Sequence, residues 1–466
     1  MATQRSNHHG SMAYVYLLTL VAALGGLLFG YDTAVISGAI GFLETHFQLS
    51  PEMKGWAAAS ALIGCALGAA SAGVVSDRLG RKKVLLLSAL LFFISALGTA
   101  LPRTFWQFVA FRILGGLGIG AASMSSPMYI AEICPARVRG RMVSLNQFAI
   151  ISGMLVVYFV NYAIAKYGQQ FGSSWNVDYG WRWMFGSGVL PSMVFLVLLL
   201  LVPESPRWLA KQRRDREALA VLTRVNGSAR AAVELADIRQ MLAKESGLVA
   251  QLFEPGMRAV LVIGVTLAVL QQATGINVFL YYAPEIFKGM GSGVDTALLQ
   301  TVLVGAVNLI FTVIAIWTVD FVGRKPLMLV GSAGMGACLL AVGMAAYQQQ
   351  TELWVLAFVL GYIACFALSV GPVTWVILSE IFPTKIRGRA MAIATVCLWA
   401  ANFVVTQTFT MMDENPRLVE DYHKAFPYWI YAALCAVSTV FVLVFVPETK
   451  GKTLEEIERG WEQPSS

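Results

Sequence analysis

Apolar residues fill twelve long stretches of this chain, and polar residues are concentrated in the segments between them. Each stretch is apolar on all sides, so it lacks the alternation of apolar and polar positions that a membrane β-strand requires. A membrane-spanning helix needs about 20 mostly apolar residues. The pattern therefore predicts an all-α membrane protein with twelve transmembrane helices, at residues 14–41, 56–75, 84–101, 105–131, 142–165, 183–202, 257–287, 296–319, 326–347, 354–379, 390–411 and 426–446.

One long polar segment divides the chain, and the sequences on its two sides repeat each other. Asp-Arg-Leu-Gly-Arg-Lys begins at Asp77, and Asp-Phe-Val-Gly-Arg-Lys begins at Asp320. Membrane loops can resemble each other simply because they are basic, but here acid, Gly and Arg recur in the same order. Parallel repeats of six helices are typical of transporters that rock around a central site. We predict a tail at 1–13, six-helix bundles at 14–202 and 257–446, a cytoplasmic helical linker at 203–256 and a tail at 447–466.

The composition excludes two classes of protein. Hydrophobic residues make up 57% of the chain and charged residues 13%, whereas soluble domains hold about 25% charged residues. Neither a water-soluble enzyme nor a disordered chain fits. Most of the 34 Lys and Arg residues fall on one side of the membrane, which the positive-inside rule makes cytoplasmic together with both termini. This asymmetry explains the net charge of +7 without a nucleic-acid partner.

Two ionisable residues, Asp32 and Arg112, lie well inside predicted helices. A charge within the membrane is unfavourable and indicates a functional role. Counting 1.5 Å per residue from the helix ends places both at a similar depth in the outer half of the membrane, where they can meet. An Asp beside Arg stays ionised, and loss of that partner favours protonation, so a conformational change could load and unload a proton. The alternative is a purely structural ion pair.

The seventh predicted helix carries the polar residues Gln271, Gln272 and Asn277, followed by Tyr281. Amides in an apolar span are unfavourable unless they form hydrogen bonds, and Gly275 allows the helix to loosen there, as in discontinuous transporter helices. Amides supply both donors and acceptors, which sugar hydroxyls need. The set has no spare charge, so it favours a neutral solute; the alternative is amides that hold helices together. Further candidates on other helices are Gln147, Asn308, Trp375 and Trp399.

Acids and Arg residues recur at helix ends that we place on the cytoplasmic side. In low-dielectric surroundings such pairs can lock neighbouring helices and separate when the halves rock. The simpler interpretation is that they are solvated among lipid headgroups. We predict that Glu132, Arg139, Glu380 and Arg387 form a network that closes the cytoplasmic side. The other expected members of this gating network are Asp77, Arg81, Glu204, Asp320, Arg324 and Glu448.

Other patterns do not indicate catalytic chemistry. A glycine-rich run at 116–121 fits a dinucleotide-binding fingerprint, but no strand precedes it. Gly116 and Gly120 are better interpreted as small residues at a contact between helices. The six Cys residues lie in or beside apolar stretches and are expected to be free thiols. Because neither a nucleophile with its base nor a metal cluster is recognisable in the sequence, we expect no enzyme, no cofactor and no metal ion.

Four motifs resemble the sugar porter family of the major facilitator superfamily, and the resemblance covers residues 14–460. They are Gly-Gly-Leu-Leu-Phe-Gly-Tyr-Asp at 25–32, Pro-Glu-Ser-Pro-Arg-Trp-Leu at 203–209, Gln-Gln-Ala-Thr-Gly-Ile-Asn at 271–277 and Pro-Glu-Thr-Lys-Gly-Lys-Thr-Leu-Glu-Glu at 447–456. The resemblance implies the major facilitator fold, with Asp32 as the proton-coupling carboxylate and Arg112 as its partner. Asp favours symport, since family uniporters usually carry Asn there. It also implies sugar contacts by Phe29, Gln147, Gln271, Gln272, Asn277, Tyr281, Asn308, Trp375 and Trp399.

Within that family the chain looks most like bacterial symporters of xylose and protons. This implies a proton-coupled importer of a neutral monosaccharide, in the bacterial inner membrane, acting as a monomer with sugar, proton and lipid bilayer as partners. Met154 and Leu398 depart from the pattern, because Gln is expected at both positions and each change loses hydrogen bonds to a hydroxyl. We therefore expect D-xylose, with D-glucose or another hexose as the alternative. A uniporter and a non-transporting sugar sensor are the remaining alternatives.

Overall fold

The computed structural model describes residues 11–135, 137–172, 174–244, 255–350, 353–382 and 387–451. Twelve helices in this part of the chain are long and apolar enough to cross a membrane, as the sequence predicts, and no strand occurs within it. Many large apolar side chains point outward; Leu201 is 77% exposed and Phe321 is 82% exposed. Extended exposed apolar surface of this kind marks an interaction site, and here it suits contact with lipid.

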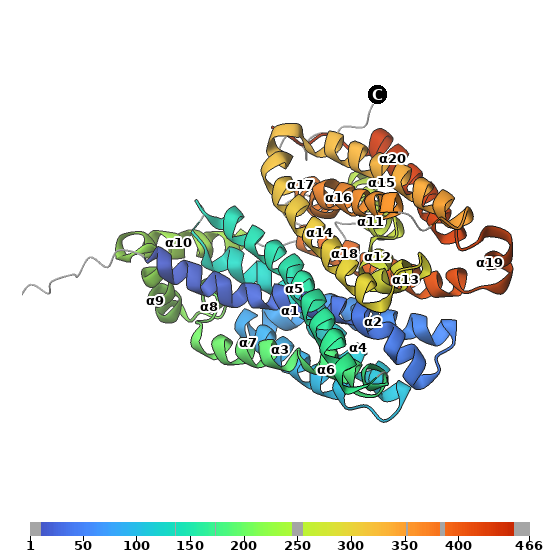
Figure 1. Ribbon diagram of the computed structural model, residues 1–466. Helices are drawn as coiled ribbons and strands as arrows, with labels where there is room; N and C mark the ends of the chain where they lie inside the picture. The colour runs from blue at the N-terminus through green and yellow to red at the C-terminus, as the bar shows by residue number, and fades with distance from the viewer. Residues whose placement is uncertain are drawn as a thin grey trace, which may run out of the picture.

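The first six spans form the N-terminal half of the molecule (Figure 1). Inside it, α1 packs against α4 and α5, and α2 packs against α4. The sixth span is broken into short turns and two helices. The elements are α1 (Met12–Phe47), α2 (Pro51–Leu79), α3 (Arg81–Ala100), α4 (Phe105–Ile133), α5 (Arg139–Gly168), η1 (Gln169–Phe171), η2 (Asn176–Gly180), α6 (Trp181–Gly186) and α7 (Val189–Leu201).

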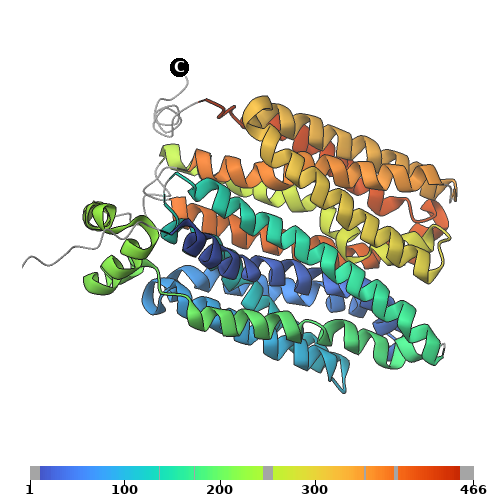
Figure 2. The ribbon, with the colours of Figure 1, turned by 60° about the vertical axis from the view of Figure 1, so that its left-hand side comes forward.

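Three short helices and the last six spans follow. The short helices α8 to α10 lie together at one end of the N-terminal half (Figure 2). In the C-terminal half, α15 packs against α20 and α16, and α11 packs against α18. The elements are α8 (Pro206–Lys211), α9 (Asp215–Asn226), α10 (Ser228–Lys244), α11 (Pro255–Ala273), α12 (Ile276–Tyr281), α13 (Ala283–Gly289), α14 (Val294–Val322), α15 (Arg324–Tyr347), α16 (Leu353–Cys365), η4 (Phe366–Val370), α17 (Gly371–Ile381), α18 (Arg387–Asp413), α19 (Pro416–Tyr422) and α20 (Phe426–Phe445).

The end of the molecule that carries α8 to α10 is called the linker end below, and the opposite end the far end. The two halves contact each other mainly through α2 with α18 and α5 with α14. Residues 1–10, 245–254 and 452–466 of the predicted tails and linker lie outside the described residues.

The first helix is longer than the sequence predicts. It was expected at 14–41, but it runs from Met12 to Phe47 and ends where Gln48 adopts a left-handed conformation with φ of 51°. The extension is held by packing rather than by lipid: the rings of His46 and Phe47 lie 5.3 Å and 5.7 Å from that of Trp181. Tertiary contacts therefore carry the helix beyond the apolar stretch.

The predicted break in the seventh span is present. Gly275 separates α11 from α12 and has φ of +88°, a conformation that L side chains rarely adopt. A second break, in the tenth span, was not predicted: there a π-helical turn, η4, lies between α16 and α17. Both breaks leave backbone carbonyls free to accept hydrogen bonds from side chains.

Helices α2 and α4 approach each other backbone to backbone. A Cβ added at Gly64 or Gly68 of α2 would clash with backbone atoms of α4, and one added at Gly116 or Gly120 would clash with backbone atoms of α2. The prediction that Gly116 and Gly120 mark a contact between helices is therefore confirmed. Small residues allow this approach because membrane helices associate by close packing.

Candidate functional site

Asp32 of α1 and Arg112 of α4 meet inside the N-terminal half. Nη1 of Arg112 donates to Oδ2 of Asp32 at 3.2 Å and to the Asp32 backbone carbonyl at 2.9 Å. The Arg112 side chain is 2% exposed and the Asp32 side chain 13% exposed. Because Nε of Arg112 has no hydrogen-bond partner among the described residues, the guanidinium keeps unused donor capacity. A shielded pair of this kind has a charge state that depends on the packing around it.

A cavity of only about 10 Å³, about the size needed for one water molecule, lies beside Asp32. The residues that line it belong to the N-terminal half and include Phe92 and Ser192. Next to it, the hydroxyls of Tyr31 and Ser187 hydrogen-bond at 2.7 Å, where α6 gives way to α7. The carboxylate therefore faces the interior of this half and not the lipid.

Three amides of the seventh span are joined in a chain. Nε2 of Gln271 donates to the carbonyls of Val370 at 3.2 Å and Gly371 at 2.9 Å, where the tenth span is broken. Gln272 donates to Oε1 of Gln271 at 3.3 Å and accepts a hydrogen bond from Asn277. Gln271 is 3% exposed and Gln272 is 8% exposed. A sugar hydroxyl can replace an amide partner in such a chain, because it both donates and accepts.

Two aromatic rings from different halves lie side by side, with their planes inclined by 53°. The ring centroids of Phe29 in α1 and Trp399 in α18 are 5.6 Å apart. Trp399 is buried, and its Nε1 has no hydrogen-bond partner among the described residues. A buried donor without a partner costs about 1–3 kcal/mol, and a ligand hydroxyl would relieve that cost.

One buried amide near this region was not singled out from the sequence. The side chain of Asn402, on α18, is 1% exposed and accepts a hydrogen bond from Thr406 at 3.0 Å. The available signal was the same as for the seventh span, an amide within an apolar stretch.

The other predicted sugar contacts lie on neighbouring helices. Gln147 on α5 and Trp375 on α17 are half-buried, and Asn308 on α14 is 4% exposed. Helix α14 packs against both α5 and α17, although no described hydrogen bond joins these three side chains to the amide chain. Met154 on α5 and Leu398 on α18 are buried.

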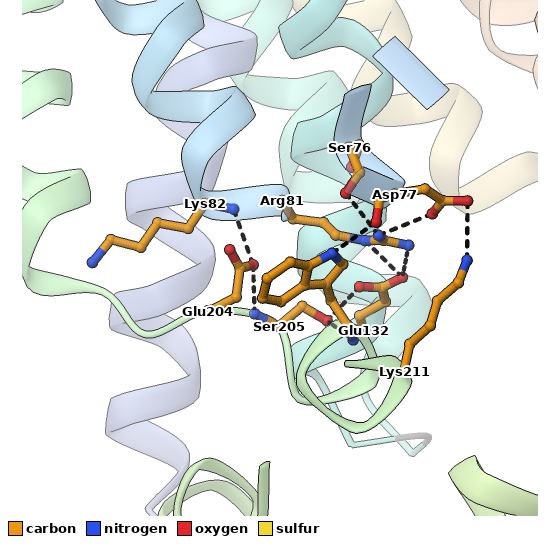
Figure 3. Close-up of polar contacts among 9 residues, drawn as sticks. Ser76, Asp77, Arg81, Lys82, Glu132, Glu204, Ser205 and Lys211 are labelled. Carbon is orange, nitrogen blue, oxygen red and sulfur yellow. Dashed lines mark hydrogen bonds and ion pairs between the residues drawn. The ribbon is translucent and has the colours of Figure 1, made fainter. Parts of the chain in front are cut away.

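At the linker end of the N-terminal half, Arg81 binds two acids (Figure 3). Nη2 of Arg81 lies 3.0 Å from Oε1 of Glu132, and Nη1 lies 3.1 Å from Oδ1 of Asp77. Glu132 also accepts a hydrogen bond from the Ser205 hydroxyl. Glu204 accepts from the backbone N–H of Lys82 at 3.1 Å and so satisfies a donor at the start of α3.

The C-terminal half repeats this arrangement. Nη2 of Arg324 lies 2.9 Å from Oε1 of Glu380 and 3.0 Å from Oδ1 of Asp320, and Thr449 donates to Glu380 at 2.6 Å. Glu448 accepts from the backbone N–H groups of Arg324 and Lys325 at 3.1 Å and 3.0 Å. Each cluster also contains a glycine with φ near +100°: Gly80 lies beside Glu204, and Gly323 lies beside Glu448. The repeat seen in the sequence is thus a repeat of side-chain contacts.

These clusters hold the described acids and Arg81 and Arg324 of the predicted gating network, and closure of the cytoplasmic side by that network stays a prediction. Glu132 pairs with Arg81 and Glu380 with Arg324, so in this conformation each cluster lies within one half. In the described part of the chain the exposed Arg139 forms no ion pair with Glu132. The turn at each positive-φ glycine explains the choice of partner, because it directs the following Arg toward the acid. The side chain of Arg387 lies outside the described residues.

At the far end, side chains join the two halves. The Tyr158 hydroxyl of α5 donates to the Leu280 carbonyl of α12 at 2.8 Å. Gln169 donates to Asp295, in the first turn of α14, at 2.6 Å. Such contacts close the far end between the halves.

Twelve apolar helices in two halves with repeated contacts, and buried polar side chains where the halves meet, define a membrane transport protein of the major facilitator fold. The chain belongs to the family described as "Sugar (and other) transporter", whose model matches residues 18–461. Its relatives are transporters and not enzymes, and with twelve apolar helices it is a multi-pass protein of the bacterial inner membrane.

Two curated relatives cover nearly the whole chain. The D-xylose-proton symporter of Escherichia coli is 47% identical over 98% of this chain and 97% of its own length. The glucose facilitated diffusion protein of Zymomonas mobilis is 41% identical over 97% of this chain and 98% of its own length.

Two solved structures of the E. coli xylose transporter also match. Its inward-open conformation superimposes with a TM-score of 0.85 at 46% identity, covering 96% of this chain and 100% of that one. The complex with 6-bromo-6-deoxy-D-glucose gives a TM-score of 0.80 at 47% identity, covering 96% of this chain and 99% of that one.

Proposed function

We propose that this chain is a proton-coupled symporter that imports a neutral monosaccharide by alternating access. The shielded pair of Asp32 and Arg112 carries the proposal, because a buried carboxylate with an adjustable partner can bind and release a proton. One charge moved across 100 mV is worth about 2.3 kcal/mol, which corresponds to roughly fifty-fold accumulation of sugar.

The amide chain and the aromatic pair supply the proposed sugar site. Gln271, Gln272 and Asn277 offer donors and acceptors to hydroxyls, while Phe29 and Trp399 offer apolar faces to C–H groups. The remaining contacts that we propose are Gln147, Tyr281, Asn308 and Trp375. We assign the clusters around Arg81 and Arg324 to holding each half rigid at its linker end.

The linker end is the cytoplasmic end in this proposal, and both chain termini are cytoplasmic. The loops at that end carry most of the Lys and Arg residues, as the positive-inside rule requires. With the far end closed, the described state is then inward-facing, as in the inward-open relative.

D-xylose is the proposed substrate, and D-glucose or another hexose is the alternative. The E. coli relative is a D-xylose-proton symporter, and one of its structures holds a bromodeoxy derivative of glucose. Met154 and Leu398 offer no hydrogen bond where an amide could, which favours a sugar with fewer hydroxyl contacts on that side. Competition of unlabelled pentoses and hexoses against labelled xylose decides between them.

Uptake into proteoliposomes tests the coupling. With an imposed inward proton gradient, the wild type should accumulate labelled xylose, and a protonophore should abolish the accumulation. Asp32→Asn removes the titratable group but keeps a similar shape, so it should bind and exchange sugar without concentrating it. A mutant that still accumulates sugar would refute the assignment of Asp32.

Facilitated diffusion is the second candidate, since the Zymomonas relative carries that name. A uniporter would equilibrate sugar to the same level with and without the proton gradient. It would also show no difference between wild type and Asp32→Asn in that assay.

A further inference from the structure

A buried lysine joins the two halves at the far end. Nζ of Lys54, in the first turn of α2, lies 2.7 Å from Oε2 of Glu44 in α1 and 2.8 Å from Oε1 of Glu414, which follows α18. The Lys54 side chain is 7% exposed, compared with 34% for Glu44 and 27% for Glu414. One ammonium therefore bonds an acid of its own half and an acid of the other half.

All three charges have the wrong sign for the helix ends they occupy. A helix favours anions in its first turn and cations in its last turn, by about 0.3–1 kcal/mol each. Lys54 is a cation in a first turn, Glu44 is an anion in the last turn of α1, and Glu414 is an anion at the end of α18. The helix dipoles thus disfavour each of the three charges at its position, and the ion pairs between them offset this unfavourable interaction.

The side chains of α18 beside this ion pair form a polar seam with α2. Thr410 donates to the Pro51 carbonyl at 2.8 Å, and Gln407 donates to the Glu52 carbonyl at 3.0 Å. Gln407, Thr410 and Glu414 are spaced three and four residues apart, so they share one face of the helix. Gly55 permits the approach, since a Cβ there would lie 2.7 Å from Nε2 of Gln407.

A polar seam suits a contact that must open in every transport cycle. When the halves separate at this end, water replaces each lost hydrogen bond, so the net free-energy change per bond is only about 1 kcal/mol. The contact between Lys54 and Glu44 lies within the N-terminal half and persists, so Lys54 retains a partner when Glu414 leaves.

We propose that Lys54 and Glu414 form a lock that holds the far end closed and sets the balance between the two orientations of the transporter. The proposal rests on the proposed alternating-access cycle, but it does not depend on which sugar or ion is carried. Breaking the lock favours the orientation that is open at the far end.

Hydrogen exchange measured by mass spectrometry, on the purified full-length protein in nanodiscs without sugar, tests this. In Lys54→Met, segments 50–56 and 407–414 should exchange faster than in wild type, while segments 76–82 and 204–208 at the linker end should exchange more slowly. The expected change in the ratio of the two orientations is roughly tenfold, which corresponds to about 1.4 kcal/mol. Lys54→Arg, which keeps the charge, should behave as wild type.

Two further variants make the test specific. Glu414→Gln should also give faster exchange at the far end and slower exchange at the linker end. The double variant should add little to this change, because both substitutions remove the same contact. Lys424→Met is the control, since Lys424 pairs with Asp413 of its own half at 3.2 Å.

Faster exchange at both ends of Lys54→Met would overturn the proposal by showing a purely structural role, and unchanged exchange at both ends would overturn it as well. Hydrogen exchange requires neither sugar nor a gradient. Faster exchange at the far end together with slower exchange at the linker end would therefore support the lock even if the transport assays excluded proton coupling.

Discussion

At the scale of single residues, Gln272 stands at the centre of the proposed sugar site. It donates to Gln271 and accepts from Asn277, so its loss leaves both neighbouring amides without that partner. Gln271 keeps its bonds to the carbonyls of the tenth span, which should preserve the local fold.

Gln272→Ala should therefore weaken sugar binding by more than about 1 kcal/mol, the usual effect of an unmatched polar partner. Isothermal titration calorimetry with xylose measures it. Gln300→Ala is a matched control, because Gln300 bonds Ser292 outside the proposed site. Equal affinities of wild type and Gln272→Ala would place the sugar elsewhere.

Glu448 provides a prediction on pH. Burial of this carboxylate raises its pKa, but the backbone N–H groups of Lys450, Arg324, Lys325 and Thr449 outweigh burial and hold the pKa below its ordinary value of 4.5. A carboxyl whose pKa is lower in the folded state stabilises the fold above its unfolded-state pKa, and this stabilisation is lost as the pH falls through the folded-state value.

Thermal melting at pH values from 7 down to 4 tests this. At pH 7 the Glu448→Gln variant should melt below wild type, and the gap should narrow once the pH falls below about 4.5. Glu420→Gln, on the exposed surface of α19, should follow the wild type throughout. A gap that is independent of pH would contradict the assigned role of the charge.

At the scale of secondary-structure elements, the break in the seventh span depends on one residue. Gly275 has φ of +88°, and a Cβ at this position would lie 2.7 Å from the ring of Tyr431. Both the backbone conformation and the ring exclude a side chain, so α11 and α12 can meet at this angle only through glycine.

Gly275→Ala should lower stability by about 1–2 kcal/mol from backbone strain alone, with an additional loss from the contact with Tyr431. It should also weaken sugar binding, because the break positions Asn277 against Gln272. Thermal melting and calorimetry provide the two readouts. Gly289→Ala should be nearly neutral, since nothing lies within 4 Å of a Cβ there; equal effects of the two substitutions would refute the argument.

The elements also show what a sequence can and cannot predict. Helix number follows from apolar length, and the meeting of Asp32 with Arg112 follows from depth along two helices, since both depend on regular geometry. The break at Gly275 follows from an amide and glycine cluster. The partner of Glu132 does not follow, because it depends on a turn at Gly80 whose direction is set by tertiary contacts.

At the scale of the whole molecule, the two clusters at the linker end are equivalent in design but differ in burial. The Glu132 side chain beside Arg81 is 9% exposed, whereas the Glu380 side chain beside Arg324 is 21% exposed. An acid that loses its partner is destabilising in proportion to its separation from water.

Arg81→Gln should therefore destabilise the protein by about 3 kcal/mol or more, and Arg324→Gln by less. Differential scanning fluorimetry of both variants ranks them, with the exposed Arg139→Gln as a control. If Arg324→Gln proved the more damaging substitution, burial would not govern these clusters.

The interlocked backbones of α2 and α4 have a mechanical consequence. Where Gly64, Gly68, Gly116 and Gly120 meet, the two helices have no side chains between them that could change rotamer and absorb strain. Helix α2 also contacts α18 in the other half. A displacement of the far end of α2 therefore moves α4, the helix that carries Arg112. Opening of the far end and rearrangement around the buried Arg112 would then occur together as a single motion.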